Sequence, residues 1–155
     1  MGIGDANLGG NVHGGVIMHL CDEVAGIAAV RHSGRRAVTA AMDRMTFIHP
    51  VYVGQLVTLK ATVNAAWRTS MEVGVRVESE DIRSGEVVHT CSAYLTMVAL
   101  DDEGRPAPVP AVRPETAKEE RRAREAQVRR DSRLAERQRI EAGREDQTVV
   151  REGPG

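Results

Sequence analysis

Residues 14–31 read GGVIMHLCDEVAGIAAVR, and this stretch decides the fold. Its larger apolar side chains recur at the 3.6-residue spacing of an α-helix. They form one stripe made of Ile17, Leu20, Val24, Ile27 and Ala28. A helix with so wide an apolar stripe needs a second layer of structure to cover it. Ser33-Gly34 follows, and we expect the helix to end there.

Asp22 lies on neither the apolar stripe nor the charged side of this helix. By helical phase it shares a second face with Met18, Ala25 and Ala29. A carboxylate among small apolar side chains is costly unless it is paired or used in chemistry. No oppositely charged residue nearby in sequence falls on that face, so we expect another surface to shield Asp22 from water. A structural hydrogen bond with His13 and a catalytic role both remain open from the residues alone.

Four segments after the helix have the pattern of antiparallel strands. Apolar and polar residues alternate along much of their length, as in strands that bury one face. The segments are residues 38–47, 57–67, 71–78 and 87–100. A long antiparallel sheet wrapped around the single helix is the simplest two-layer arrangement. The sequence therefore predicts an α+β domain that occupies residues 1–112.

The composition changes after Pro110. Residues 113–142 are rich in Arg, Glu, Ala and Gln, with few apolar positions. This pattern predicts a charged C-terminal helix stabilised by ion pairs four residues apart. We expect residues 143–155 to be disordered. The acidic residues that balance the arginines, and the lack of interleaved aromatic residues, argue against nucleic-acid binding.

The overall composition is ordinary for a soluble globular protein. The chain has 155 residues, 41% of them hydrophobic, and a formal net charge of −1. This charge predicts no general attraction to nucleic acid or membrane. The two cysteines, Cys21 and Cys91, lie in no metal-binding spacing. There is no secretory signal pattern and no apolar run long enough to span a membrane, so we expect a cytoplasmic protein without a metal.

The segment Asn11-Val12-His13-Gly14-Gly15 leads directly into the helix. Two glycines at a helix start let a ligand approach the backbone closely. The free N–H groups there, with the positive end of the helix dipole, suit an oxygen that carries negative charge. This feature is common in proteins, so by itself it indicates only a candidate anion site.

Several stretches resemble the hotdog-fold acyl-CoA thioesterases. They are residues 11–28, Phe47-Ile48-His49-Pro50, residues 68–73 and Glu103-Gly104-Arg105-Pro106. The chain is most similar to the cytosolic (brain-type) acyl-CoA hydrolases and their bacterial single-domain relatives. The likeness covers about residues 5–142, and its helix motif is long. It implies a hotdog fold, in which an antiparallel sheet wraps around one long helix.

The resemblance also implies a reaction and a site. Asp22 is expected to act as general base on water or to attack the thioester carbonyl itself. The backbone N–H of Gly15 is expected to stabilise the oxyanion, and Asn11 of a second protomer to orient the water or the carbonyl. Substrate contacts are expected from His13, Gly14, Arg31, Arg68 and Ser70. The expected assembly is a homodimer, with three dimers forming a hexamer, and no cofactor is expected besides the CoA of the substrate.

One departure from the family and two alternatives remain. The family has a strand before the loop Asp5-Ala6-Asn7, whereas this chain begins only a few residues earlier. The sheet edge and the floor of the acyl tunnel are therefore open questions. A hotdog hydratase or dehydratase would use a His with an acid, and His13 and Asp22 resemble such a pair. A non-catalytic acyl-CoA-binding protein is the other alternative.

Overall fold

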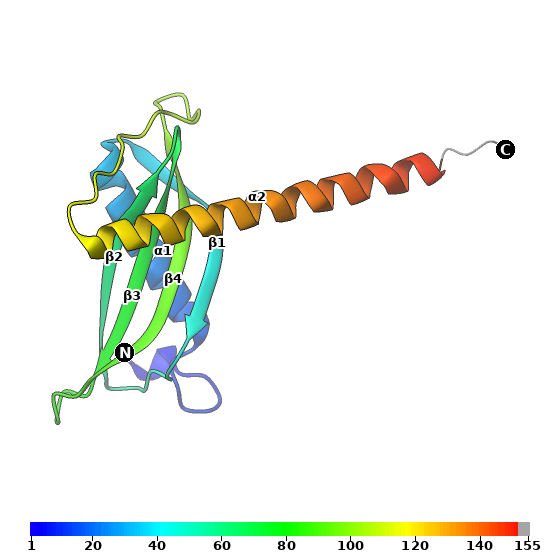
Figure 1. The fold of residues 1–155 in the computed structure, drawn as a ribbon. Coiled ribbons are helices and arrows are strands. Elements are labelled where there is room, and N and C mark those ends of the chain that lie inside the picture. Colours follow the sequence, from blue (N-terminus) through cyan, green and yellow to red (C-terminus); the bar gives the residue numbers. More distant parts are fainter. Residues whose placement is uncertain (152–155) are drawn as a thin grey trace. The chain divides into compact units, whose positions relative to one another are not determined.

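The computed structural model of the protein describes residues 1–151 (Figure 1). Met1–Pro114 forms one compact unit, and the segment from Glu115 onward forms a second. The predicted boundary after residue 112 lies close to this division. Among the described residues, no helix is long and apolar enough to cross a membrane.

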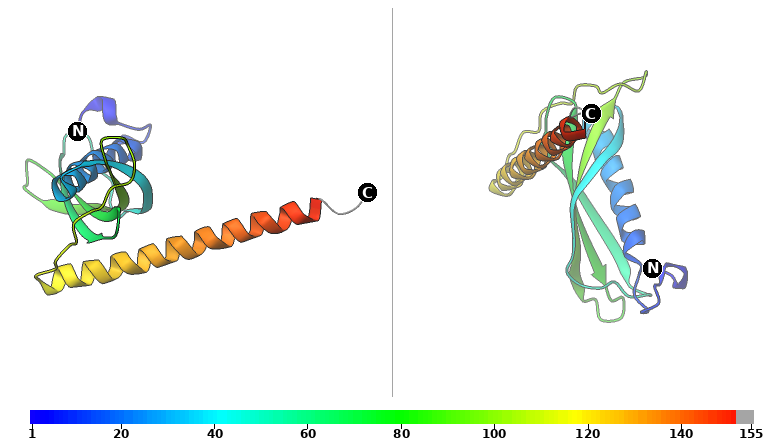
Figure 2. Two further views of the ribbon diagram at one scale, coloured as in Figure 1. Left: turned by 90° about the horizontal axis from the view of Figure 1, so that it is seen from above. Right: turned by 90° about the vertical axis from the view of Figure 1, so that its right-hand side faces the viewer.

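The first unit is a two-layer α+β domain, as predicted. Its sheet consists of β1 (Arg36–Phe47), β2 (Leu56–Ala66), β3 (Ser70–Glu80) and β4 (Val87–Leu100). The strand order is β1-β4-β3-β2, and every pairing is antiparallel. The long helix α1 (Gly14–Ser33) lies along one face of the curved sheet and contacts all four strands (Figures 1 and 2).

The core lies between α1 and the two central strands. Alternate residues of β3 and β4 point toward the helix and are fully buried, as the period of two requires. They are Met71, Val73, Val75, Val77, Cys91, Ala93, Leu95, Met97 and Ala99. Most are aliphatic, and this explains how a chain with 3% aromatic residues fills its core.

The buried face of α1 differs from the predicted one. It is a row of mostly small residues spaced by four, namely Ile17, Cys21, Ala25, Ala29 and Ser33. Of the predicted stripe only Ile17 is fully buried, and Ile27 is 54% exposed. The prediction was wrong because it ranked faces by hydrophobicity. Small side chains let the helix axis approach the sheet closely, so residue size decided the orientation.

The end of α1 agrees with the prediction. Gly34 adopts a left-handed conformation with φ 65°, and its N–H donates to Val30 O at 2.9 Å. Glycine reaches this conformation without a steric penalty, which explains why the helix stops here.

The segment before α1 contains the short 3-10 helix η1 (Ile3–Asp5) and isolated bridges. Met1 pairs with the chain just ahead of β2: its amino group donates to Gln55 O at 3.0 Å and its carbonyl accepts the Gly54 N–H at 3.0 Å. Within residues 1–151 the named strands are therefore the four of the sheet. The N-terminus lies beside the start of β2, which is the edge strand opposite β1.

The second unit is helix α2 (Ala117–Arg151). Thr116 and Glu119 form a reciprocal cap at its start: Thr116 Oγ1 accepts the Glu119 N–H, and the Glu119 carboxylate accepts the Thr116 N–H. In the structure α2 extends to Arg151, past the predicted helix end at residue 142. No proline interrupts this stretch, and Gly143 lowers helix stability by only about 1 kcal/mol relative to alanine. Residues 152–155 of the expected tail lie outside the described residues.

Candidate active site

Asp22 lies on an exposed side of α1, where it meets the first strand of the sheet. Thr39 of β1 donates its hydroxyl proton to Asp22 Oδ1 at 2.5 Å. β1 is an edge strand, so the pair lies beside the open edge of the sheet. Asp22 is exposed in the single chain. The shielding that we expected is therefore not provided within the single chain.

The pairing of β1 shifts register next to Thr39. The threonine pairs with Met97 of β4, and the register changes between Thr39 and Ala41. Such a bulge changes the direction of nearby side chains, and bulges occur often beside active sites. The Thr39 hydroxyl also lies 3.3 Å from Met97 Sδ. The Thr39 hydroxyl is thus held by contacts with both the helix, through Asp22, and the sheet, through Met97.

His13 is the N-cap of α1. Its backbone is extended, and its Nδ1 accepts the N–H of Gly15 at 3.0 Å. Asp22 lies nine residues farther along, about 13 Å at 1.5 Å per residue, so His13 caps the helix start and does not contact Asp22. The Gly15 N–H, our predicted oxyanion donor, therefore already has an acceptor. Within residues 1–151 the structure gives the Gly14 N–H no acceptor.

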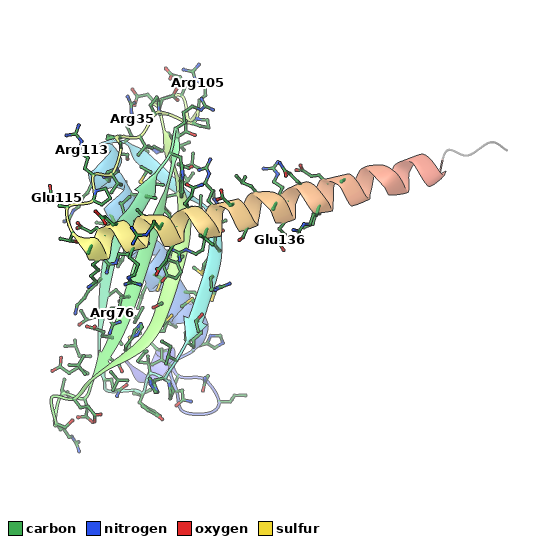
Figure 3. The ribbon with its side chains drawn as sticks, viewed as in Figure 1. Arg35, Arg76, Arg105, Arg113, Glu115 and Glu136 are labelled. Atoms are coloured by element: carbon green, nitrogen blue, oxygen red, sulfur yellow. The ribbon has the colours of Figure 1, made fainter. Side chains whose placement is uncertain are left out.

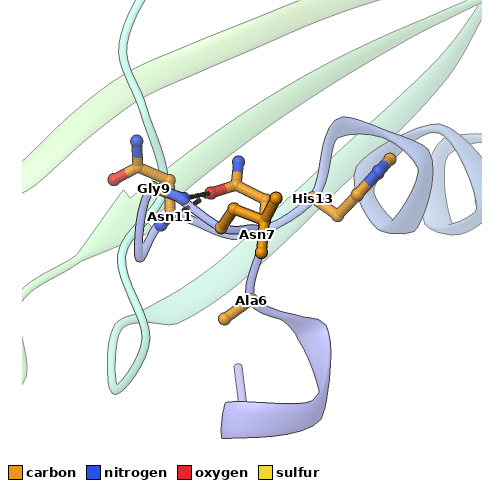
Figure 4. Close-up of a pocket in the computed structure, with 6 residues that line it drawn as sticks. Ala6, Asn7, Gly9, Asn11 and His13 are labelled. Atoms are coloured by element: carbon orange, nitrogen blue, oxygen red, sulfur yellow. Dashed lines mark hydrogen bonds between the residues drawn. The ribbon is translucent and has the colours of Figure 1, made fainter.

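The loop before His13 is organised by Asn7. Its side-chain Oδ1 accepts the N–H groups of Gly9 at 2.8 Å and Asn11 at 3.2 Å (Figure 4). Gly10, with φ 80°, supplies the left-handed conformation that closes the turn. Because both bonds use the oxygen of Asn7, its amide NH₂ remains available to a ligand. The loop surrounds an open cavity of about 630 Å³, lined by Ala6, Asn7, Leu8, Gly9, Asn11 and His13.

A second, mainly apolar groove of about 380 Å³ adjoins the helix start. Its lining residues are Asn7, Asn11, Val12, Gly14, Ile17, Phe47, Ile48, His49, Pro50 and Val51. The Phe47 ring lies so close that a Cβ on Gly14 would meet it at 3.4 Å. The fold thus brings the motif Phe47-Ile48-His49-Pro50 to the start of α1, although the two are far apart in sequence.

The remaining predicted contact residues lie at the other end of the domain. Arg31 is in the last turn of α1, about 25 Å from Gly14 at 1.5 Å per residue. Arg68 lies in the turn between β2 and β3, and Ser70 is the first residue of β3; the Trp67 N–H donates to Ser70 O across this turn. Within one chain the structure therefore separates these residues from the His13 loop. Arg35 and Arg105 are exposed at this same end of the domain (Figure 3).

The cysteines are buried and inert. Burial raises the pKa of Cys21 to about 12, with a smaller contribution from Cys91. Burial likewise raises the pKa of Cys91 to about 11. Both thiols are therefore protonated at neutral pH and unsuited to nucleophilic attack. Among residues 1–151 no cluster of three His, Cys, Asp or Glu residues could hold a metal ion.

An ion-pair cluster on β2 and β3 involves Glu78 rather than Asp22. Hydrogen bonds from Lys60 and then Arg76 lower the pKa of Glu78 to about 2. The three side chains project from β2 and β3, at 2.5 and 2.7 Å from one another. A carboxylate held ionised by two cations cannot take up a proton near neutral pH, so Glu78 is not a candidate base.

Comparison with known proteins identifies the family. Residues 9–86 match the model of the thioesterase superfamily. This chain belongs to the thioesterase superfamily. Protein VdlD of Helicobacter pylori is 41% identical over 128 residues, which are 83% of this chain and 73% of VdlD. The cytosolic acyl coenzyme A thioester hydrolase of Rattus norvegicus is 39% identical over 83% of this chain, but over only 34% of its own length.

Solved structures of this superfamily share the fold. An apo-hexameric acyl-CoA thioesterase superposes with a TM-score of 0.85 at 38% identity, covering 88% of this chain and 87% of its own. The acyl-CoA hydrolase of Staphylococcus aureus, solved with butyryl coenzyme A and coenzyme A, has a TM-score of 0.84 at 35% identity. It covers 97% of this chain and 90% of its own. These likenesses confirm the predicted resemblance and the hotdog architecture.

The staphylococcal hydrolase was also solved as three alanine variants, of an asparagine, an aspartate and a threonine. In that protein the aspartate follows the asparagine by 15 positions and precedes the threonine by 17. In this thioesterase, Asp22 has the same spacing from Asn7 and Thr39. From the sequence we singled out neither of these two residues and chose Asn11 instead. The turn that Asn7 organises could have indicated it, whereas nothing in the strand pattern distinguishes Thr39.

Proposed function

We propose that this thioesterase hydrolyses fatty acyl-CoA to free fatty acid and CoA, with Asp22 as the reacting carboxylate. The observation that carries the assignment is the hydrogen bond from Thr39 to Asp22 at the open edge of the sheet. Asp22 and Thr39 are separated by 17 positions in the sequence. The aspartate and the threonine that were changed to alanine in the staphylococcal acyl-CoA hydrolase have the same separation. The reaction needs water and the substrate, and no cofactor is invoked.

Thr39 prepares Asp22 for its part in the reaction. Its hydroxyl occupies Oδ1 of the carboxylate and fixes the rotation of the side chain. Oδ2 is then free either to take a proton from a water that attacks the thioester carbon, or to attack that carbon directly. In both routes the carbonyl π electrons move to oxygen, and the C–S bond breaks when they return. On the direct route the acyl group is then joined to Asp22 as an anhydride, and a water molecule hydrolyses it to fatty acid and the free carboxylate. The leaving thiolate is stable enough that no strong general acid is required.

The oxyanion donor in this proposal is the N–H of the partner subunit's Gly14, because within one chain Gly14 lies about 12 Å along the helix from Asp22. Gly15, which we first expected to donate, bonds His13 instead. Gly14 opens the first turn of α1 and lines the apolar groove, so its N–H lies at the positive end of the helix dipole. The absence of a side chain lets a carbonyl oxygen approach the backbone closely. Gly14 thus moves from a predicted substrate contact to a catalytic donor.

The amide that orients the carbonyl or the water is assigned to Asn7 rather than Asn11. The turn fixes the Asn7 oxygen and directs its NH₂ away from the loop backbone. We place this amide across a homodimer, so that the partner subunit's Asn7 faces Asp22. Exposed apolar side chains flank Asp22 on α1 and on the β1 edge, namely Met18, Ile27 and Val38. A two-fold interface here would cover them and create two equivalent sites.

We infer the oligomeric state and the cellular compartment of this protein from its relatives. Solved neighbours include thioesterases described as hexameric, and we propose a trimer of dimers for this protein. Arg31, Arg68 and Ser70 are proposed to contact the CoA phosphates from the far end of the domain. We place the protein in the cytoplasm, as the cytosolic relatives are named.

A panel of acyl-CoA substrates, with released thiol measured by a colorimetric reagent, tests the function. We expect steady thiol release by the wild type. Thr39→Val, which keeps the shape but removes the hydroxyl, should lower kcat about tenfold to a hundredfold. Thr58→Val, the same substitution at an exposed position of β2, is the matched control. Hydration of an enoyl-CoA without thiol release would indicate the hydratase alternative, and CoA retention without turnover the non-catalytic one.

A further inference from the structure

Met97 of β4 is the residue that Thr39 of β1 faces across the sheet. The two are Cα partners in the antiparallel pairing, so their side chains lie on the same face. The Met97 side chain is 1% exposed and belongs to the hydrophobic core. Its Sδ lies 3.3 Å from the Thr39 hydroxyl oxygen. A buried thioether is thus in contact with the hydroxyl that bonds Asp22.

The Thr39 hydroxyl has one proton and meets two acceptors. The Asp22 carboxylate oxygen lies at 2.5 Å, whereas the thioether sulfur is a neutral, weak acceptor at 3.3 Å. A bond to an ionised carboxylate is charge-assisted, so the proton goes to Asp22 while that residue is ionised. When Oδ2 has taken up a proton or the acyl group, the carboxyl is neutral and this advantage is lost. The sulfur of Met97 then competes for the same proton.

The position of Thr39 on the sheet explains why such a second contact matters. Thr39 is exposed on an edge strand, next to the register shift before Ala41. A threonine side chain has three staggered χ1 rotamers, and the other two would move the hydroxyl away from Asp22. Both acceptors contact the same hydroxyl oxygen, so both favour the observed rotamer. Met97, fixed in the core, favours it independently of the charge on Asp22.

We propose that Met97 is a positioning residue of the thioesterase, whose buried sulfur holds the Thr39 hydroxyl toward Asp22 and keeps it there while Asp22 is neutral during turnover. The catalytic part of this inference rests on the proposed function. Met97 acts through Thr39 and not on the substrate. Loss of the sulfur should therefore lower kcat and leave KM unchanged.

An aliphatic replacement of Met97 is the first test. Met97→Leu roughly conserves volume and removes the sulfur. Met71→Leu is the matched control, because Met71 is the β3 partner of Met97 and is also fully buried. We expect Met97→Leu to lower kcat about threefold to tenfold at unchanged KM, and Met71→Leu to keep the wild-type kcat. Unchanged kcat in Met97→Leu would overturn the proposal.

A double-mutant cycle with Thr39→Val separates positioning from packing. Thr39→Val has no hydroxyl for Met97 to hold, so adding Met97→Leu should lower its kcat no further. A purely structural role of Met97 predicts the same fractional loss of kcat with and without the Thr39 hydroxyl. That result would refute the proposed action through Thr39.

A structural measurement tests the contact without reference to activity. In a crystal structure of Asp22→Ala, Met97 is left as the acceptor, so Thr39 Oγ1 should stay beside Sδ. In Asp22→Ala/Met97→Leu, Thr39 should adopt other χ1 rotamers. A Thr39 hydroxyl that turns away from Met97 in Asp22→Ala would refute the positioning role and leave the hydrolase assignment standing. Absence of thiol release by the wild type would refute the hydrolase assignment, and the Thr39 rotamers in these two structures would still decide whether Met97 holds the hydroxyl.

Discussion

Helices α1 and α2 are stabilised by different interactions. α1 buries a row of small residues against the sheet, and its neighbours in the tertiary structure hold it. α2 carries ion pairs four residues apart, such as Arg121 with Glu125 and Arg137 with Glu141, together with a reciprocal cap at its start. Exposed pairs of this kind each contribute only a few tenths of a kcal/mol.

This difference explains where chemistry is possible. A helix held by packing can tolerate a glycine pair at its start and, in its middle, an acid that forms no ion pair within the helix. A helix stabilised only by local interactions would favour neither. Gly14 and Asp22 occupy those two positions in α1. α2 instead consists largely of residues that favour helix by themselves. We therefore expect substitutions at Gly14, at Asp22 and on the buried face of α1 to change activity or global stability, and those at exposed positions of α2 to have small, local effects.

The largest effect is expected at Asp22. Asp22→Asn keeps the size of the side chain and its ability to accept from Thr39, but removes the reacting carboxylate. We expect kcat to fall at least about a thousandfold, with no loss of thermal stability. Glu23→Gln, the next residue and also exposed, is the control that should retain activity. Near-normal turnover by Asp22→Asn would remove Asp22 from the mechanism.

The loop before α1 should show a contrast between its two asparagines. Asn7→Ala removes the NH₂ donor and both hydrogen bonds of the turn, and we expect kcat/KM to fall about a hundredfold. Asn11 takes part in the turn through its backbone N–H, so Asn11→Ala should remain within a few-fold of wild type. Steady-state kinetics of the two variants will show which asparagine supplies the functional amide, and circular dichroism will show whether each variant folds.

Mixing subunits tests where the Asn7 amide acts. Asn7→Ala and Asp22→Asn homodimers should each be nearly inactive. If the site is shared, a mixed dimer contains one intact site, so subunit exchange should restore part of the activity. No recovery after demonstrated exchange would place both residues in the same protomer.

Packing of α1 is the next largest expected effect. Ala25 is fully buried, so Ala25→Leu adds atoms where the helix contacts the sheet, and we expect a loss of about 1–3 kcal/mol of unfolding free energy. Ile27 belongs to the stripe first expected in the core but is largely exposed. Ile27→Ala should cost less than about 1 kcal/mol in the unfolding of a single domain. Chemical denaturation measures the unfolding free energy of both variants. A larger loss for Ile27→Ala than for Ala25→Leu would indicate that the predicted stripe, and not the small-residue face, packs in the core.

The smallest effect is expected in α2. Thr116→Ala removes the hydroxyl that caps the helix start, which typically contributes about 1 kcal/mol to helix stability. Because the cap is local, thiol release should stay at the wild-type rate. Hydrogen exchange of the first turn of α2 is the sensitive readout, and faster exchange should be confined to that turn. A loss of turnover would show that α2 contributes to the active site.

Sequence alone was sufficient for much of the fold. The spacing of Ile17 and its neighbours predicted α1, the period of two predicted the four strands, and Gly34 predicted the helix end. These features follow from interactions between residues close in the chain, which a linear pattern records directly. The sequence also indicated Asp22, because an acid on a face of small apolar residues is unusual.

The tertiary structure decided how these parts serve the site. The close approach of α1 to the sheet selected its small-residue face, against the ranking by hydrophobicity. The register of β1 brought Thr39 to Asp22, and the cap formed by His13 moved the expected oxyanion donor from Gly15 to Gly14. Each depends on distances between segments far apart in the chain. Such distances are set by packing and strand pairing, which no local pattern of residues encodes.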